Sequence, residues 1–378
     1  DAFIGSILWI ILFTIVSYFS FKTRSKLFSV TNTLNVMGLS LLLLGLLQLG
    51  STKRVEEQKL VLPTIPYDKP AARDIGADVP DIYFIVLDAY AGADILDEVY
   101  DYDNTEFTDY LKEKGFFVAE KSRSNYNHTG LSLSSCLNMQ YLQDVDGLIT
   151  KETIIRNSYS LMDRLIRNNV LFPFLRDHGY KIVSFASGRR ETEIPNADMY
   201  LSSGSGLNRF DNEVLNATPI PFVLHVLNAI ENETKDQIDI YREQILYILD
   251  NFIEATQVDS PIFVFAHIES PHPPFVFGKN GEKVVYEKIL NDHDGNWLIR
   301  KGRITLSQYL QGYREQVMHI NKRMKRIIKD ILSRSEKDSV IILMGDHGPR
   351  ALKVWNNPEE TYMKECMSIL NAYYVPAQ

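Results

Sequence analysis

The stretch that most constrains the fold of this chain runs from Ser339 to Arg350 and reads SVIILMGDHGPR. Residues 340–344 form an apolar run that is typical of a strand buried inside a sheet. A glycine on each side of Asp346 and His347 predicts a sharp turn directly after that strand. In α/β proteins, functional residues gather at the carboxyl ends of the strands. A carboxylate beside an imidazole in such a place predicts a divalent-metal site, and a turn aspartate beside a solvated histidine is the simpler alternative.

Strand-like and helix-like segments alternate from residue 81 to the end of the chain. Strands are expected at residues 81–87, 116–119, 180–186, 261–267, 340–344 and 371–375. Helices are expected at residues 105–114, 131–139, 161–177, 237–255 and 307–332, and a loop at residues 187–215. Such alternation predicts an α/β fold with a mostly parallel sheet and helices on both faces.

Two stretches near the start of the chain, residues 2–21 and 27–52, carry no charged residue. Each reaches the about 20 residues that a helix needs to cross a bilayer. We therefore expect two transmembrane helices in residues 1–52 and a proline-containing linker in residues 53–78, followed by one α/β domain in residues 79–378. A cleaved signal peptide is the alternative for the first stretch, and a buried core helix for the second. The basic residues between the two stretches predict a cytoplasmic loop, and with it an extracytoplasmic α/β domain, by the positive-inside rule.

The net charge argues against one class of partner. It is −8 at pH 7, and no basic cluster interrupts the acidic balance, so nucleic acid is not an expected partner. The two cysteines, Cys136 and Cys366, leave no cysteine-based zinc motif. The candidate ligands are therefore oxygen atoms and imidazoles.

Asp88 follows a second apolar run, residues 82–87, and is expected at the same strand edge as Asp346. A turn residue or helix cap is the simpler interpretation of a lone aspartate at a strand end. Two neighbouring carboxylates without a cation would repel each other until one of them bound a proton. The pairing of Asp88 with Asp346 and His347 therefore favours one shared metal site.

Thr129 lies where a polar loop meets a helix-like stretch, in the sequence NHTGLSL. The start of a helix favours a bound anion such as phosphate and stabilises an alkoxide. A hydroxyl is a weak nucleophile that a metal ion would activate, so Thr129 is the candidate nucleophile. A simple N-cap is the alternative role, and Ser132, Ser134 and Ser135 are the rival hydroxyls.

Two histidines, His267 and His272, follow a third strand-like run in the sequence FAHIESPHPPF. The prolines around His272 stiffen its loop, and an imidazole there suits protonation of a leaving group or contact with a substrate oxyanion. His267 is either a substrate contact or a hydrogen-bonded core residue. Arg189 and Arg350 also follow strand-like runs. Arginine suits phosphate recognition, which makes both candidate substrate contacts, although solvated surface charge is the commoner explanation.

In this order, the segments resemble the sulfatase-like branch of the alkaline phosphatase superfamily. The resemblance extends from residue 80 to the end of the chain and is closest to membrane-anchored phosphotransferases, such as lipoteichoic acid synthase and the phosphoethanolamine transferases. It implies that Asp88, Thr129, Asp346 and His347 bind one divalent metal ion, with Thr129 as the nucleophile and His272 as a substrate contact. It also implies that residues 79–378 are an extracytoplasmic catalytic domain, here expected to be truncated at its C-terminus.

The resulting hypothesis is metal-dependent transfer of a phosphoryl or substituted phosphoryl group to an envelope acceptor, through a covalent phosphothreonine. A membrane lipid or glycan is the expected substrate, the bilayer an expected partner, and Mn²⁺, Zn²⁺ and Mg²⁺ are all open as the metal. Thr129 is followed by GLSL, so the Cys/Ser-x-Pro-x-Arg motif of formylglycine sulfatases is absent. Two alternatives stay open: hydrolysis of phosphate or sulfate esters, and a catalytically inactive, membrane-tethered binding module.

Overall fold

The computed structural model describes Tyr18 and residues 79–144, 161–203, 237–259, 261–284, 295–334, 338–354, 357 and 359–376. The chain separates into two units, and of these residues only Tyr18 belongs to the smaller one, Asp1–Thr64 with Leu215–Leu224. The larger unit, Ile65–Val214 with His225–Gln378, carries the sheet. Apart from Tyr18, the predicted transmembrane helices and linker lie outside the described residues. Among the residues described, no helix has the length and apolar character needed to cross a membrane.

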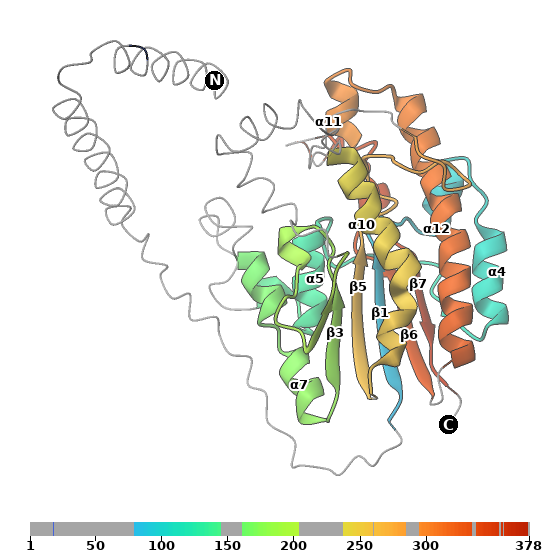
Figure 1. The fold of residues 1–378 in the computed structure, drawn as a ribbon. Helices are drawn as coiled ribbons and strands as arrows, with labels where there is room; N and C mark the ends of the chain where they lie inside the picture. Colours follow the sequence, from blue (N-terminus) through green and yellow to red (C-terminus); the bar gives the residue numbers. More distant parts are fainter. Residues whose placement is uncertain are drawn as a thin grey trace. The chain divides into compact units, whose positions relative to one another are not determined.

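A seven-stranded mixed sheet forms the centre of the larger unit, with the strand order β2-β7-β6-β1-β5-β3-β4 (Figure 1). Its strands are β1 (Asp81–Leu87), β2 (Phe117–Val118), β3 (Lys181–Phe185), β4 (Met199–Leu201), β5 (Ile262–Ile268), β6 (Ser339–Gly345) and β7 (Asn371–Tyr374). Strands β6, β1, β5, β3 and β4 are parallel, whereas β7 runs antiparallel to β6 and β2 antiparallel to β7. The predicted α/β class with a mostly parallel sheet is confirmed. The antiparallel edge was not predicted, and β4 lies in a stretch that was expected to be a loop.

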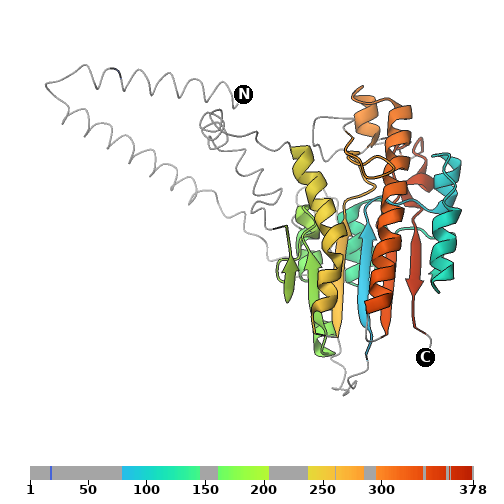
Figure 2. The same ribbon diagram turned by 45° about the vertical axis from the view of Figure 1, so that its right-hand side comes forward.

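Helices cover both faces of this sheet (Figures 1 and 2). They include α3 (Ala93–Glu98), α4 (Thr105–Glu113), α5 (Thr129–Leu137), α7 (Leu171–Asp177), α10 (Gln237–Asn251), α11 (Gly295–Arg300), α12 (Leu306–Arg334) and α13 (Met363–Met367). Tyr83 and Ile85 of β1 share one core with side chains of α10 and α12. Phe84 and Val86 share a second core with side chains of α5 and α7. Side chains of β1 therefore alternate between two cores, as expected of a strand that is buried on both faces.

The single helix expected at residues 161–177 is wrong, because the structure divides it in two. Residues 161–167 are helical, and α7 starts a new helix after a short break. Asn169 lies in the break, where its side-chain oxygen accepts the N–H of Phe172 at 2.9 Å. Pro173 then falls in the first turn of α7, where its missing N–H breaks no helical hydrogen bond.

The register of the central strands brings their carboxyl ends into line. Leu87, the last residue of β1, pairs with Ile268 of β5 and with Gly345 of β6. Asp88 and Asp346, which follow β1 and β6, therefore leave the sheet side by side. This edge is where an open α/β sheet offers a crevice for ligands.

Candidate metal centre at the carboxyl edge of the sheet

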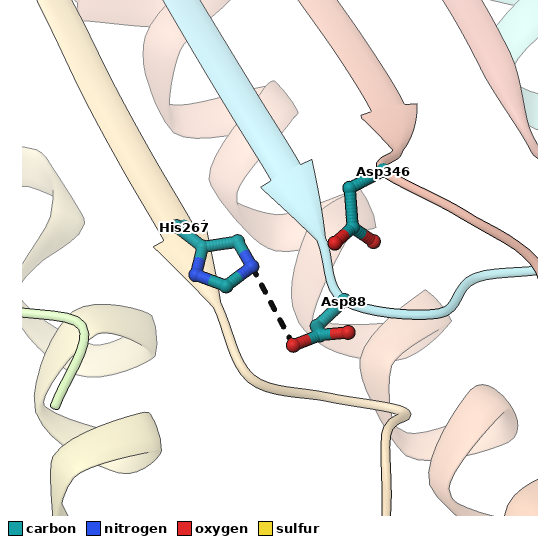
Figure 3. A group of neighbouring side chains, drawn as sticks. All are labelled: Asp88, His267 and Asp346. Atoms are coloured by element: carbon teal, nitrogen blue, oxygen red, sulfur yellow. Dashed lines mark ion pairs between the residues drawn. The ribbon is translucent and has the colours of Figure 1, made fainter. Parts of the chain in front are cut away.

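Two buried aspartates, Asp88 and Asp346, form the centre of the site (Figure 3). Oδ1 of Asp346 accepts the N–H groups of Ala89 and His347, each at 2.9 Å, so the turns after β1 and β6 together fix this carboxylate. Oδ1 of Asp88 and Oδ2 of Asp346 have no hydrogen-bond partner among the described residues. Buried carboxylate oxygens without donors are unfavourable unless a cation or a proton neutralises them.

His347 turns its ring toward the same two carboxylates. Its Nδ1 lies 2.8 Å from the carbonyl oxygen of Gly348, and a carbonyl only accepts, so Nδ1 carries the proton and Nε2 presents a lone pair. That Nε2 lies 3.4 Å from Oδ1 of Asp88 and 3.6 Å from Oδ2 of Asp346. It also lies 3.2 Å from the hydroxyl oxygen of Thr129. The four residues predicted as metal ligands therefore meet around one small space.

Thr129 is the first residue of α5, and the N-cap position belongs to His128. The alternative role of Thr129 as an N-cap is therefore wrong, and its buried hydroxyl contacts His347 instead. Ser135, one of the rival hydroxyls, donates to the carbonyl oxygen of Gln140 at 2.7 Å. The sequence placed Thr129 at a helix start, and the fold brings that helix start to the strand edge.

Close approach of the backbone explains the two glycines that flank Asp346 and His347. A Cβ atom on Gly345 would lie 2.4 Å from the carbonyl oxygen of Tyr90. A Cβ atom on Gly348 would lie 1.9 Å from a backbone oxygen of α13. Both distances are far inside van der Waals contact, so only glycine fits this turn.

His267 of β5 points toward Asp88 at the end of β1 (Figure 3). Its Nε2 lies 3.6 Å from Oδ2 of Asp88 and has no hydrogen-bond partner among the described residues. Its Nδ1 lies 3.0 Å from the hydroxyl oxygen of Thr192. One ligand atom each from Asp88, His267 and Asp346 lie within 4.8 Å of one another. His267, which the sequence suggested as a substrate contact, is thus placed as a further candidate ligand.

The surroundings of the two carboxylates shift their pKa values in opposite directions. Burial, and then the charge of Asp346, raise the pKa of Asp88 well above its usual value. Burial also acts to raise the pKa of Asp346, but His347, His267 and the hydrogen bond from Ala89 outweigh it, and the pKa of Asp346 lies below its usual value. A bound cation would relieve the repulsion between the two carboxylates and compete with any proton that the pair holds.

The histidines of the site are neutral at pH 7. Burial lowers the pKa of His267 to about 4 and that of His272 to about 3, and it lowers the pKa of His347 well below its usual value. The backbone N–H of His272 donates to the carbonyl oxygen of Asp88 at 3.0 Å. Nδ1 of His272 donates to the carbonyl oxygen of Pro273, so its Nε2 also presents a lone pair. The His272 ring lies 6.2 Å from the His347 ring, centroid to centroid.

Arg189 reaches the site from the loop after β3 and is surrounded by carboxylates. Its Nη1 lies 3.0 Å from Oδ2 of Asp88 and 3.5 Å from Oε1 of Glu269, and its Nε lies 2.7 Å from Oε1 of Glu191. The sequence did not single out Glu191 or Glu269. Glu269 directly follows β5, as Asp88 follows β1, and this signal was available. Glu191 lies in a short 3-10 helix, Arg190–Thr192, and no strand end directly precedes it to give such a signal.

Arg350, the other candidate arginine, is also buried. Its guanidinium donates to the carbonyl oxygen of Asn127, two residues before Thr129. Arg350 therefore ties the turn after β6 to the loop that leads into α5.

A family model described as Sulfatase matches residues 80–369, which is more than half of the chain. The chain belongs to the sulfatase family. It is therefore an enzyme of the alkaline phosphatase superfamily, as its motifs predicted, with a candidate metal site at the strand edge. No curated protein matches its sequence.

Several solved structures are similar to this sulfatase-family chain. The integral membrane protein lipooligosaccharide phosphoethanolamine transferase A from Neisseria meningitidis matches with 14% identity and a TM-score of 0.47, over 80% of this chain and 49% of that one. The C-terminal periplasmic domain of EptC from Escherichia coli, in complex with Zn, matches with 11% identity and a TM-score of 0.48, over 79% of this chain and 74% of that one. The C-terminal periplasmic domain of phosphoethanolamine transferase EptC from Campylobacter jejuni matches with 12% identity and a TM-score of 0.47, over 78% of this chain and 79% of that one. The match spans about half the length of the Neisseria protein.

The residues of this site fit a divalent metal ion. Ligand atoms about 2.1 Å from a tetrahedral ion lie about 3.4 Å from one another. Nε2 of His347 lies 3.2, 3.4 and 3.6 Å from the oxygens of Thr129, Asp88 and Asp346. The buried oxygens that lack donors supply hard, negative ligands, and the neutral imidazoles supply nitrogen lone pairs.

Proposed function

We propose that this enzyme transfers a phosphoryl or substituted phosphoryl group through a covalent phosphothreonine at Thr129, with one divalent metal ion held by Asp88, Thr129, Asp346 and His347. The observation that carries the proposal is the position of the Thr129 hydroxyl. It is buried at the start of α5, 3.2 Å from the lone-pair nitrogen of His347. A hydroxyl so placed, beside two carboxylates that need a cation, is suited to become an activated nucleophile.

The chemistry follows from these groups. A bound ion supplies a lower pKa for the Thr129 hydroxyl and offsets charge on the phosphoryl oxygens. The Thr129 oxygen forms a bond to phosphorus while the bond from phosphorus to the leaving oxygen breaks. The Thr129 proton passes to the leaving oxygen, and His272, which presents an Nε2 lone pair, is the candidate contact for that oxygen. Attack by a sugar hydroxyl or by water then breaks the phosphothreonine bond, and the acceptor proton returns to Thr129 by the same route.

The charge of the surrounding groups supports a single divalent ion. Four buried carboxylates and two arginines line the centre, which leaves two net negative charges when all are ionised: Asp88, Asp346, Glu191, Glu269, Arg189 and Arg350. One divalent cation offsets this charge, and the neutral histidines add none. A second divalent ion would leave the buried centre positively charged, which burial disfavours.

The same proposal places the catalytic domain outside the cytoplasm, tethered by helices in residues 1–52, with a membrane lipid or glycan as substrate. Its support is the pair of uncharged stretches and the basic residues Lys22, Arg24 and Lys26 between them. Protease added to intact spheroplasts should digest the domain of residues 79–378. Full protection until the membrane is broken would contradict this orientation.

Substitution of the nucleophile gives the central test. Thr129→Ala should lower turnover more than about 1000-fold, about 4 kcal/mol in the barrier, because no side-chain oxygen remains to attack phosphorus. Release of p-nitrophenol from bis(p-nitrophenyl) phosphate by the metal-loaded full chain measures this turnover. Thr129→Ser keeps the oxygen and is the matched control, which should retain part of the activity. Near-normal turnover of Thr129→Ala would refute the nucleophile.

Mass spectrometry of the quenched enzyme separates the remaining candidate functions. After exposure to a phospholipid donor, the peptide that contains Thr129 should gain the mass of the transferred group in the parent enzyme and not in Thr129→Ala. Release of that group by a sugar faster than by water identifies a transferase, and equal release identifies a hydrolase. A full chain that binds none of Mn²⁺, Zn²⁺ and Mg²⁺ would instead support the inactive binding module.

A further inference from the structure

We propose that Glu365 is a positioning residue for this site: it holds the turn after β6 in the shape that aims His347 at the metal ion. The inference rests on the proposed function, in which His347 is a metal ligand. Glu365 lies in α13 and is fully buried. A buried carboxylate is stable only when charged or polar partners surround it, so its partners reveal its role.

The carboxylate of Glu365 accepts hydrogen bonds from the backbone at the end of the turn. Its Oε1 accepts the N–H of Ala351 at 2.9 Å, and its Oε2 accepts the N–H of Leu352 at 2.9 Å. Oε1 also accepts the hydroxyl of Tyr100 at 2.7 Å. Burial, and then the charge of Glu365, raise the pKa of Tyr100 well above its usual value, so this hydroxyl keeps its proton and donates. Charge-assisted bonds of this kind are among the strongest that a buried side chain makes.

The backbone of α13 contacts the start of the same turn. The N–H of Gly348 donates to the carbonyl oxygen of Cys366 at 2.9 Å. The carbonyl oxygen of Glu365 occupies the space that a Cβ on Gly348 would need, 1.9 Å from that position. The carbonyl oxygen of Gly348 in turn accepts the Nδ1 proton of His347, which directs Nε2 to the carboxylates. A chain of contacts therefore runs from α13 to the candidate metal ligand.

Arg350 lies between the two ends of the turn that α13 holds. Its guanidinium donates to the carbonyl oxygen of Asn127, in the loop that leads to Thr129. Through Arg350, the hydrogen bonds that Glu365 accepts from Ala351 and Leu352 therefore also help to position Thr129. Groups that orient a metal ligand from behind typically change metal affinity about 10- to 100-fold when they are lost.

Two tyrosines connect this turn to the one after β1. The ring of Tyr100 lies 4.3 Å from that of Tyr313 on α12, centroid to centroid. The Tyr313 hydroxyl donates to the carbonyl oxygen of Ala89 at 2.7 Å and accepts the N–H of Ala91 at 3.0 Å. The aromatic pair thus connects the turn after β1, at Ala89 and Ala91, with Glu365, which holds the turn after β6. This arrangement suits a scaffold that fixes the distance between Asp88 and His347.

Co²⁺ binding to the metal-free full chain tests the inference, since the visible absorption of Co²⁺ reports both affinity and coordination geometry. Glu365→Gln is the main variant, because the glutamine NH₂ group would face the N–H of Leu352, donor against donor. Its Co²⁺ dissociation constant should rise about tenfold, and the intensity of its absorption bands should change. Tyr100→Phe removes one donor to the same carboxylate and should weaken binding about threefold. Glu360→Gln, at an exposed position before α13, is the matched control and should bind as the parent does.

The outcomes separate the inference from the proposed function. If the parent chain binds neither Co²⁺ nor Zn²⁺, the proposed metal function fails. If the parent binds Co²⁺ and Glu365→Gln binds it with unchanged affinity and spectrum, only the role of Glu365 fails, even where its melting temperature is lower. Should Glu365→Gln not fold, Tyr100→Phe decides, and parent-like binding by Tyr100→Phe overturns the inference.

Discussion

The site has two halves that are built in different ways. In the half formed by β6 and β1, Asp346 and His347 are oriented by N–H and carbonyl groups of the turns beside them. In the half formed by β5 and β3, Arg189 is held by side-chain carboxylates, including Asp88 and Glu269 from two other strand ends. The first half fixes the direction of ligands through local backbone geometry. The second half adjusts charge through ion pairs between distant segments.

This difference assigns separate tasks to the halves. A rigid turn suits a metal ligand, because coordination depends on the direction of a lone pair. A buried ion-pair network suits control of charge, because it sets how strongly Asp88 competes for a proton. Substitutions in the first half should therefore chiefly weaken metal binding, whereas those in the second should chiefly alter its dependence on pH.

The largest effect is expected for Asp346→Asn. It replaces an ionised ligand whose Oδ2 lacks any donor among the described residues, so metal affinity should fall more than about 100-fold, beyond the usual effect of groups behind a ligand. Calorimetric titration of the metal-free chain with Zn²⁺ measures the loss. Asp338→Asn, at an exposed position just before the same strand, is the control and should bind normally. Binding by Asp346→Asn within a few-fold of the parent would remove Asp346 from the site.

The next largest effect is the difference in Zn²⁺ affinity between variants that lack the His347 or the His267 imidazole. Nε2 of His347 lies 3.2 to 3.6 Å from oxygens of three candidate ligands, whereas Nε2 of His267 lies 3.6 Å from Asp88. His347→Gln should therefore weaken Zn²⁺ binding about tenfold more than His267→Gln does. The same titration ranks both variants. The reverse order would move the metal ion into the half formed by β5 and β3.

Arg189→Gln should make metal binding depend more steeply on pH. Arg189 acts to lower the pKa of Asp88, against the stronger effects of burial and Asp346. Without this cation the pKa of Asp88 rises further, so protons displace the metal ion at a higher pH. The measurement is the ratio of Zn²⁺ affinities at pH 8 and pH 6, which should increase about threefold or more. The ratio is used because loss of Arg189 also removes its repulsion of the ion.

Arg190→Gln provides the control for that experiment. The Arg190 side chain is half-exposed and forms an ion pair with Asp163. Its ratio of affinities should match that of the parent. An unchanged ratio in Arg189→Gln would show that the second half does not set the charge of Asp88.

The smallest effect is expected at His319, which supports the loop after β5 by stacking on Phe277. Burial, and then Arg323 and Arg242, lower the pKa of His319 to about 4. The unfolded chain binds this proton near pH 6.5 and the folded chain does not. The stability contributed by neutral His319 is therefore present above pH 6.5 and declines as the pH falls toward 4.

His319→Gln removes this dependence. The melting temperature of the variant should fall less between pH 7.5 and pH 5 than that of the parent, by about 1–3 °C. Only the difference between the two pH values is informative, since glutamine also loses the stacking contact. Identical shifts in both proteins would mean that His319 is protonated in the fold at pH 5.

Much of the first half of the site was predictable from the sequence. Asp88 and Asp346 directly follow apolar runs, and Thr129 precedes a helix-like stretch, so local patterns placed them at strand ends and at a helix start. The second half was predicted less well. The sequence did not single out Glu191 or Glu269, and it placed His267 as a substrate contact because nothing local shows which residues face it. The direction of β7 was missed for the same reason, since pairing is not encoded in a single segment.

The sequence by itself determined which residues would stand at the strand ends, because apolar runs, glycines and helix starts act on neighbouring backbone. Only the tertiary structure decided which of those residues meet. The register of β1 against β6 aligned Asp88 with Asp346, and the pairing of β1 with β5 brought His267, the partner of Val86, close to Asp88. In the same fold α13 came to hold the turn that carries His347. Such contacts depend on the closure of long loops and on the packing of both faces of the sheet. Residues far apart in the chain acquire them together when the whole domain folds.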